Sequence, residues 1–101
     1  GDGEQTRDFI HVSDIVKLLR KASSKASLDA PVANFGTGNS MTINSLAETL
    51  IDVSSTTVPI NRKAGRPGEV RYSQANLNRL RELLNVGRFD PFAIHVKELL
   101  V

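Results

Sequence analysis

The sequence contains no cysteine, and this absence excludes disulfide bonds, thiolate zinc sites and a cysteine nucleophile. Aromatic residues make up only 5% of the 101 residues, so a core would be small and would hold few large side chains. No apolar run exceeds three residues, which is too short to span a membrane, and no signal-peptide pattern opens the chain. We therefore expect a soluble, cytoplasmic protein.

Neither sign of charge is in large excess, because the chain has 13 Lys and Arg residues and 11 Asp and Glu residues, which give a net charge of +2. Proteins that coat nucleic acid usually carry a larger excess, so any preference for anions must depend on where the basic residues lie. Apolar residues at 40% and charged residues at 24% are typical of a folded chain. The length corresponds to one domain or part of one.

Four segments are predicted to be helical, because apolar residues recur at helical spacing after a capping residue. The predicted caps are Ser13, Thr42, Asn76 and Asp90. The pattern after Thr42 is the clearest, with apolar residues at Ile43, Leu46, Ala47, Leu50 and Ile51. In the last helix we expect Ile94, Val96 and Leu99 to face inward.

Three short β-branched or aromatic runs, residues 7–12, 32–35 and 57–60, are predicted to be strands. The third would lie near a sheet edge, since Pro59 cannot donate a ladder hydrogen bond. Residues 61–75 combine glycine, proline and basic side chains and are predicted to form a loop. The fold class expected is therefore α/β, with about three short strands and four helices.

Two patterns are weak as functional signals. Gly36 and Gly38 resemble the start of a dinucleotide-binding loop, but the third glycine position holds Met41 and no acidic residue follows about twenty positions later. A tight turn before the second helix is the better interpretation. His11 and His95 lie 84 positions apart, and neither has a second histidine at metal-ligand spacing, so they are interpreted as partly buried or surface imidazoles.

Two arginines are more informative. Arg7 lies between a Gly/Asp/Gln-rich segment and a hydrophobic run, and Arg66 lies between Gly65 and Pro67. Planar guanidinium groups on a backbone fixed by glycine and proline suit bidentate recognition of phosphate. A solvated surface charge is the alternative for each of them.

Three segments resemble consecutive motifs of one family: residues 1–14 (GDGEQTRDFIHVSD), residues 34–43 (NFGTGNSMTI) and residues 66–73 (RPGEVRYS). In order and spacing they are similar to the C-terminal part of NAD-dependent nucleotide-sugar epimerases and dehydratases. This is the extended short-chain dehydrogenase/reductase family, to which UDP-glucose 4-epimerase belongs. The resemblance covers essentially residues 1–101, and since the chain begins inside the first motif it implies a longer parent enzyme.

The resemblance implies that residues 1–101 are a small substrate-binding lobe, which packs against an N-terminal Rossmann domain that holds NAD. It implies that Arg7 and Arg66 grip the nucleotide diphosphate of a UDP- or dTDP-sugar and that Glu69 reaches the ribose. The family's catalytic Tyr-x-x-x-Lys pair cannot be formed here, since Tyr72 is the only tyrosine and position 76 is asparagine. We therefore expect this chain alone to be catalytically inactive and to bind neither NAD nor a metal.

The partners implied are the nucleotide-sugar substrate, the Rossmann domain and, for the parent enzyme, a second copy in a homodimer. No membrane or nucleic-acid partner is expected. The alternative function is a small basic nucleic-acid-binding module, because Gly65-Arg66-Pro67 is the core of a minor-groove AT-hook. Glu69 argues against that alternative. A structural or oligomerisation segment without retained binding is the third possibility.

Overall fold

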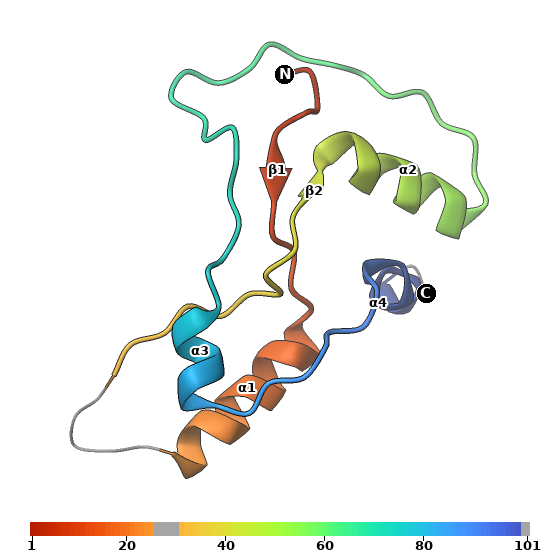
Figure 1. The fold of residues 1–101 in the computed structure, drawn as a ribbon. Helices are drawn as coiled ribbons and strands as arrows, with labels where there is room; N and C mark the ends of the chain where they lie inside the picture. The colour runs from red at the N-terminus through yellow and green to blue at the C-terminus, as the bar shows by residue number, and fades with distance from the viewer. Residues whose placement is uncertain (26–30, 100–101) are drawn as a thin grey trace.

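The computed structural model describes residues 1–25 and 31–99. These residues form four helices and one two-stranded sheet (Figure 1). The helices are α1 (Val12–Ser24), α2 (Ile43–Ser54), α3 (Asn78–Leu83) and α4 (Phe92–Leu99). Strand β1 (Thr6–Arg7) pairs antiparallel with β2 (Met41–Thr42).

All four predicted helices are present, but their predicted caps agree with the structure to different degrees. Thr42 caps α2 as predicted, since its hydroxyl accepts a hydrogen bond from the Ser45 amide at 3.0 Å. The predicted Ser13 cap of α1 is wrong by two residues, because the imidazole of His11 accepts from the Ser13 amide at 3.1 Å. Oδ1 of Asn76 accepts a hydrogen bond from the Asn78 amide at 3.0 Å, but the residue at the cap of α3 is Leu77, one position after the predicted Asn76.

The prediction of three strands is wrong for the part of the chain that the structure describes. Of residues 7–12 only Arg7 belongs to a strand, and residues 32–35 and 57–60 belong to none. The physical reason is the lack of pairing partners: Ala33 and Phe35 pack against the helical core, and residues 55–74 are exposed throughout. The predicted loop over residues 61–75 touches β1 at one point, where Thr6 forms a parallel bridge with Tyr72.

The core lies between α1 and α3. It consists of four buried leucines, Leu18, Leu77, Leu80 and Leu84, and partly buried side chains that include Ile10, Phe35 and Phe89 pack around them.

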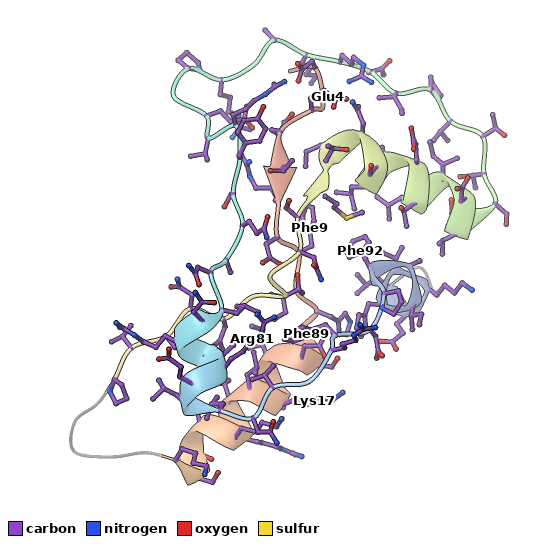
Figure 2. The ribbon with its side chains drawn as sticks, in the orientation of Figure 1. Glu4, Phe9, Lys17, Arg81, Phe89 and Phe92 are labelled. Carbon is purple, nitrogen blue, oxygen red and sulfur yellow. The ribbon has the colours of Figure 1, made fainter. Side chains whose placement is uncertain are left out.

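A second packing contact joins the start of the chain to α4, where the rings of Phe9 and Phe92 lie 5.7 Å apart (Figure 2). On α4 the inward residues are His95 and Val96. The expectation for Ile94 and Leu99 is wrong, because they are 50% and 71% exposed.

The described fold is thin and open. Its extents are 51 × 34 × 17 Å, and its radius of gyration of 16.4 Å exceeds the value of about 13 Å typical of a compact domain of this length. The accessible surface of 7625 Å² likewise exceeds the roughly 5,600 Å² expected for a folded chain of this mass. In the described residues no helix is long and apolar enough to cross a membrane.

Candidate functional site

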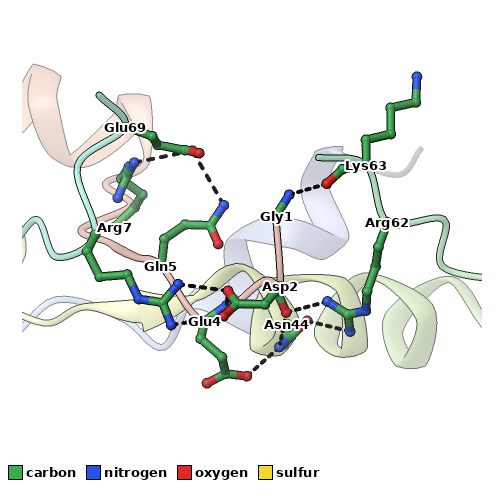
Figure 3. Close-up of polar contacts among 10 residues, drawn as sticks. Gly1, Asp2, Glu4, Gln5, Arg7, Asn44, Arg62, Lys63 and Glu69 are labelled. Carbon is green, nitrogen blue, oxygen red and sulfur yellow. Dashed lines mark hydrogen bonds and ion pairs between the residues drawn. The ribbon is translucent and has the colours of Figure 1, made fainter. Parts of the chain in front are cut away.

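The first candidate site forms where β1 meets the turn at residues 66–69. The guanidinium of Arg7 is held by the Thr6 carbonyl oxygen, which accepts from its Nη1 at 2.7 Å. Its Nη2 lies 3.7 Å from Oε1 of Glu69, and the same oxygen accepts from Nε2 of Gln5 at 3.5 Å (Figure 3). Two of the three residues singled out by the sequence therefore lie side by side, although 62 positions separate them.

Arg66 lies at the other end of the turn that carries Glu69. The Glu69 amide donates to the Arg66 carbonyl oxygen at 3.2 Å, and Gly68 adopts a φ of +76°, a conformation that side-chain-bearing residues rarely accept. The Arg66 side chain is exposed, and within residues 1–25 and 31–99 its guanidinium makes no hydrogen bond or ion pair. The structure thus brings Glu69 of this turn beside Arg7, and among the described residues no hydrogen bond or ion pair joins the Arg66 side chain to either of them.

A neighbouring polar network holds this loop in place, and the sequence did not reveal it. Arg71 donates two parallel hydrogen bonds to the carboxylate of Asp2, at 2.8 and 3.0 Å. Arg62 donates to the Asp2 carbonyl oxygen and to Oδ1 of Asn44 (Figure 3). The hydrogen bond from Arg71, aided by the Glu4 amide, lowers the pKa of Asp2 to about 2. The same contact raises the pKa of Arg71. Both arginines are therefore structural in this arrangement.

Asp8, the residue after Arg7, occupies the glycine-rich turn. Its Oδ1 accepts from the amide and the hydroxyl of Thr37, at 3.0 and 2.5 Å, and its Oδ2 accepts from the amides of Gly38 and Ala75, at 3.0 and 3.2 Å. Partial burial alone would raise the pKa of Asp8, but these hydrogen bonds outweigh it and lower the pKa. The backbone donors that a dinucleotide-binding loop would offer to phosphate are here given to a carboxylate of the same chain.

The glycines of this turn are required by its geometry. A Cβ at position 36 would lie 2.5 Å from the Cβ of Ala75, and Gly38 has a φ of +77°. The interpretation of residues 36–38 as a tight turn is therefore confirmed. Two glycines around a threonine offer amide donors that need an acceptor, and that signal could have identified Asp8.

A second cluster forms at the start of α1. The imidazole rings of His11 and His95 stack with centroids 4.2 Å apart and planes inclined by 9°. Nε2 of His95 lies 3.3 Å from Oδ2 of Asp14, and Nε2 of His11 lies 3.6 Å from Oε2 of Glu98. Both rings line a cavity of about 210 Å³. Because the two histidines lie 84 positions apart, no sequence pattern predicts this pairing.

Known proteins resemble the chain in sequence and in structure, although no protein-family model matches it. A UDP-glucose 4-epimerase of Azospirillum brasilense is 34% identical over 88 residues, which are 82% of this chain and 24% of that protein. A UDP-N-acetylglucosamine 4-epimerase from Methanobrevibacter ruminantium M1, solved with UDP-N-acetylmuramic acid, superimposes with a TM-score of 0.88 at 34% identity; the match covers 99% of this chain and 32% of that one.

A third match extends the likeness beyond epimerases. An NAD-dependent NDP-hexosamine 5,6-dehydratase, TunA, superimposes with a TM-score of 0.84 at 30% identity over 99% of this chain and 32% of that one. The chain spans about a quarter of the length of the curated relatives that it matches and about a third of the solved structures. With relatives of both reaction types, it belongs to the family of NAD-dependent nucleotide-sugar epimerases and dehydratases.

Proposed function

We propose that this chain is the C-terminal nucleotide-sugar-binding lobe of an NAD-dependent epimerase or dehydratase that acts in the cytoplasm on a UDP- or dTDP-sugar. In this proposal Arg7 and Arg66 bind the nucleotide diphosphate and Glu69 binds the ribose hydroxyls. The observation that carries it is the approach of Arg7 to Glu69 on a turn that also bears Arg66. A UDP-sugar bound to the Methanobrevibacter relative supports the same substrate class.

The chemistry of binding follows from the contacts in the ligand-free arrangement. The ion pair of Arg7 and Glu69, at 3.7 Å and partly exposed, contributes about 0–1 kcal/mol. A charge-assisted hydrogen bond from Arg7 to a phosphate oxygen contributes about 1.5–3 kcal/mol. The diphosphate therefore displaces Glu69 from Arg7, and the released carboxylate can accept hydrogen bonds from the ribose diol.

Hydride transfer requires parts that lie outside this chain. The amides of the glycine turn donate to Asp8, which leaves no prepared pyrophosphate site, so we assign NAD to another domain of the parent enzyme. The thin, open shape and the exposed apolar side chains of the described residues suit a lobe that packs on such a domain. The chain alone is accordingly inactive, because binding without cofactor or base offers no route through the reaction.

Titration with UDP, followed by NMR chemical shifts, tests the proposal. We expect UDP to shift resonances in residues 5–8 and 65–70, and Arg7→Ala or Arg66→Ala to weaken binding about 10- to 150-fold. Arg7→Lys also weakens binding, because an ammonium group cannot reproduce the planar fork. Arg20→Ala, which removes an exposed arginine on α1, is the matched control and leaves binding unchanged.

A DNA duplex rich in A·T pairs separates this proposal from the nucleic-acid alternative. If UDP shifts neither segment while the duplex shifts residues 62–71, the sugar-nucleotide function is wrong and minor-groove binding replaces it. Uridine without phosphates should bind the unaltered chain and the arginine variants with similar affinity, since it lacks the group that the arginines bind.

A further inference from the structure

The cluster at the start of α1 contains buried polar atoms that form no hydrogen bond among the described residues. The side chains of His95 and Asp14 are only 9% and 7% exposed. Nδ1 of His95 is buried and has no partner among the described residues. Nε2 of His95 and Oδ2 of Asp14 are also buried; they lie 3.3 Å from each other but form no hydrogen bond among the described residues. Buried groups of this kind are costly unless they are satisfied, so these atoms require an explanation.

The donor atoms around them are suited to a metal ion. One ligand atom each from His11, His95 and Glu98 can be chosen so that all three lie within 4.8 Å of one another. The carboxylates of Asp14 and Asp90 line the same cavity as the two imidazoles and add negative charge there. Two nitrogens and a carboxylate oxygen favour zinc-class ions over Mg²⁺ or Ca²⁺, which prefer all-oxygen sites.

We propose that His11, His95 and Glu98 form a binding site for a divalent cation of the zinc class. Asp14 acts behind the site, where its contact with Nε2 of His95 at 3.3 Å leaves Nδ1 of that ring as the metal ligand. Binding of His11 through Nε2 moves its ring proton to Nδ1, which then donates to the Ser13 hydroxyl, 2.7 Å away. The hydrogen bond that Nδ1 accepts from the Ser13 amide in the metal-free arrangement is given up. Water in the cavity of about 210 Å³ supplies the fourth ligand.

Metal binding requires a small local rearrangement. Ligand atoms of a tetrahedral zinc site lie about 3.4 Å apart, so separations of up to 4.8 Å must shorten by up to about 1.4 Å and one ring must tilt out of the parallel stack. Glu98 can follow this movement, because its side chain is 61% exposed. The bound ion would join the start of α1 to α4, in addition to the histidine stack and the contact of Asp14 with His95. Arg7, Arg66 and Glu69, the residues of the proposed nucleotide-sugar site, do not belong to this metal site.

Co²⁺ titration of the 101-residue chain, read by visible absorption, tests the site, and Zn²⁺ competition gives the affinity. We expect one equivalent of Co²⁺ to bind with the absorption of a tetrahedral complex and one equivalent of Zn²⁺ to displace it. His95→Phe, which keeps a stacked ring but removes both nitrogens, should abolish binding. Glu98→Gln should weaken binding at least 10-fold. Lys97→Ala, on the same helix but outside the cluster, should leave it unchanged.

Two results would overturn the proposal. One is the absence of stoichiometric binding of either ion to the unaltered chain. The other is binding of equal affinity to the unaltered chain and to Glu98→Gln. Because Glu98 is exposed, that substitution leaves the fold intact and decides the question even where His95→Phe does not fold.

Discussion

Replacement of Asp8 by asparagine tests the role assigned to the glycine turn. The carboxylate connects the segment after β1 to Thr37, Gly38 and Ala75 through four hydrogen bonds. Asparagine has nearly the same shape but carries no charge and has one acceptor oxygen. With that oxygen facing Thr37, the amide nitrogen faces the backbone N–H groups of Gly38 and Ala75. These two N–H groups and the side-chain NH₂ are all donors, so no hydrogen bond can form between them.

The magnitude follows from those two lost contacts. Each charge-assisted hydrogen bond contributes about 1.5–3 kcal/mol, and each donor left unsatisfied costs about 1–3 kcal/mol when it is buried. Because Asp8 is only half-buried, water can reach part of the site, so we expect a total loss of about 2–4 kcal/mol. A core of this size rarely supplies more than about 3–5 kcal/mol, so the substitution removes most of the stability.

Urea unfolding followed by circular dichroism measures the effect. Asp52→Asn is the matched control, since Asp52 is exposed on α2 and its side chain makes no hydrogen bond or ion pair within the described residues. We expect Asp8→Asn to lower the free energy of unfolding by about 2–4 kcal/mol and Asp52→Asn to change it by less than about 0.5 kcal/mol. Equal stability of the two variants would refute the argument that the turn depends on a carboxylate acceptor.

Two further substitutions and one change of pH test other contacts of the fold. Gly38→Ala, at a φ of +77°, should cost about 1–2 kcal/mol of stability in urea unfolding, whereas Gly87→Ala, which meets no atom within 4 Å, should be nearly neutral. Leu80→Ala, at a side chain only 1% exposed, should cost about 2–5 kcal/mol in the same assay. Folding lowers the pKa values of Asp2 and Asp8 from 3.8, that of Asp2 to about 2. The two carboxylates therefore stabilise the folded state fully above pH 3.8, and this stabilisation is lost as the pH falls toward 2. A urea unfolding midpoint independent of pH over that range would contradict this.

Local signals predicted the helices well. The cap at Thr42 and the apolar spacing after it lie within one segment, so the sequence of that segment contains the information that forms α2. The strands depend on partners far away: Thr6 pairs with Thr42, 36 positions later. A β-branched run without such a partner, such as residues 57–60, forms no strand. Propensity alone cannot tell these two cases apart.

The candidate sites likewise depend on contacts between residues that are far apart in the sequence. The proximity of Arg7 and Glu69 agrees with the family resemblance, but no spacing rule would have predicted it. The His11–His95 stack was invisible because it joins the start of α1 to α4 through tertiary packing alone. Asp8 was missed for a different reason: its partners are backbone amides, and the two glycines beside Thr37, which signal that these amides need an acceptor, were interpreted only as a tight turn.

Consecutive residues at the end of β1 and just after it serve different roles, one in the proposed binding and the others in stability. The backbone of Thr6 donates to the Arg71 carbonyl oxygen at 2.9 Å and accepts from the Ser73 amide at 3.2 Å, which fixes the distal end of the loop that bears Glu69. Arg7 extends toward that loop, while Asp8, the next side chain, bonds the glycine turn. Loss of the Arg7 guanidinium should therefore weaken the proposed diphosphate binding with little effect on stability. Loss of the Asp8 charge releases the strand that positions Arg7, so its effect on binding follows from its effect on folding.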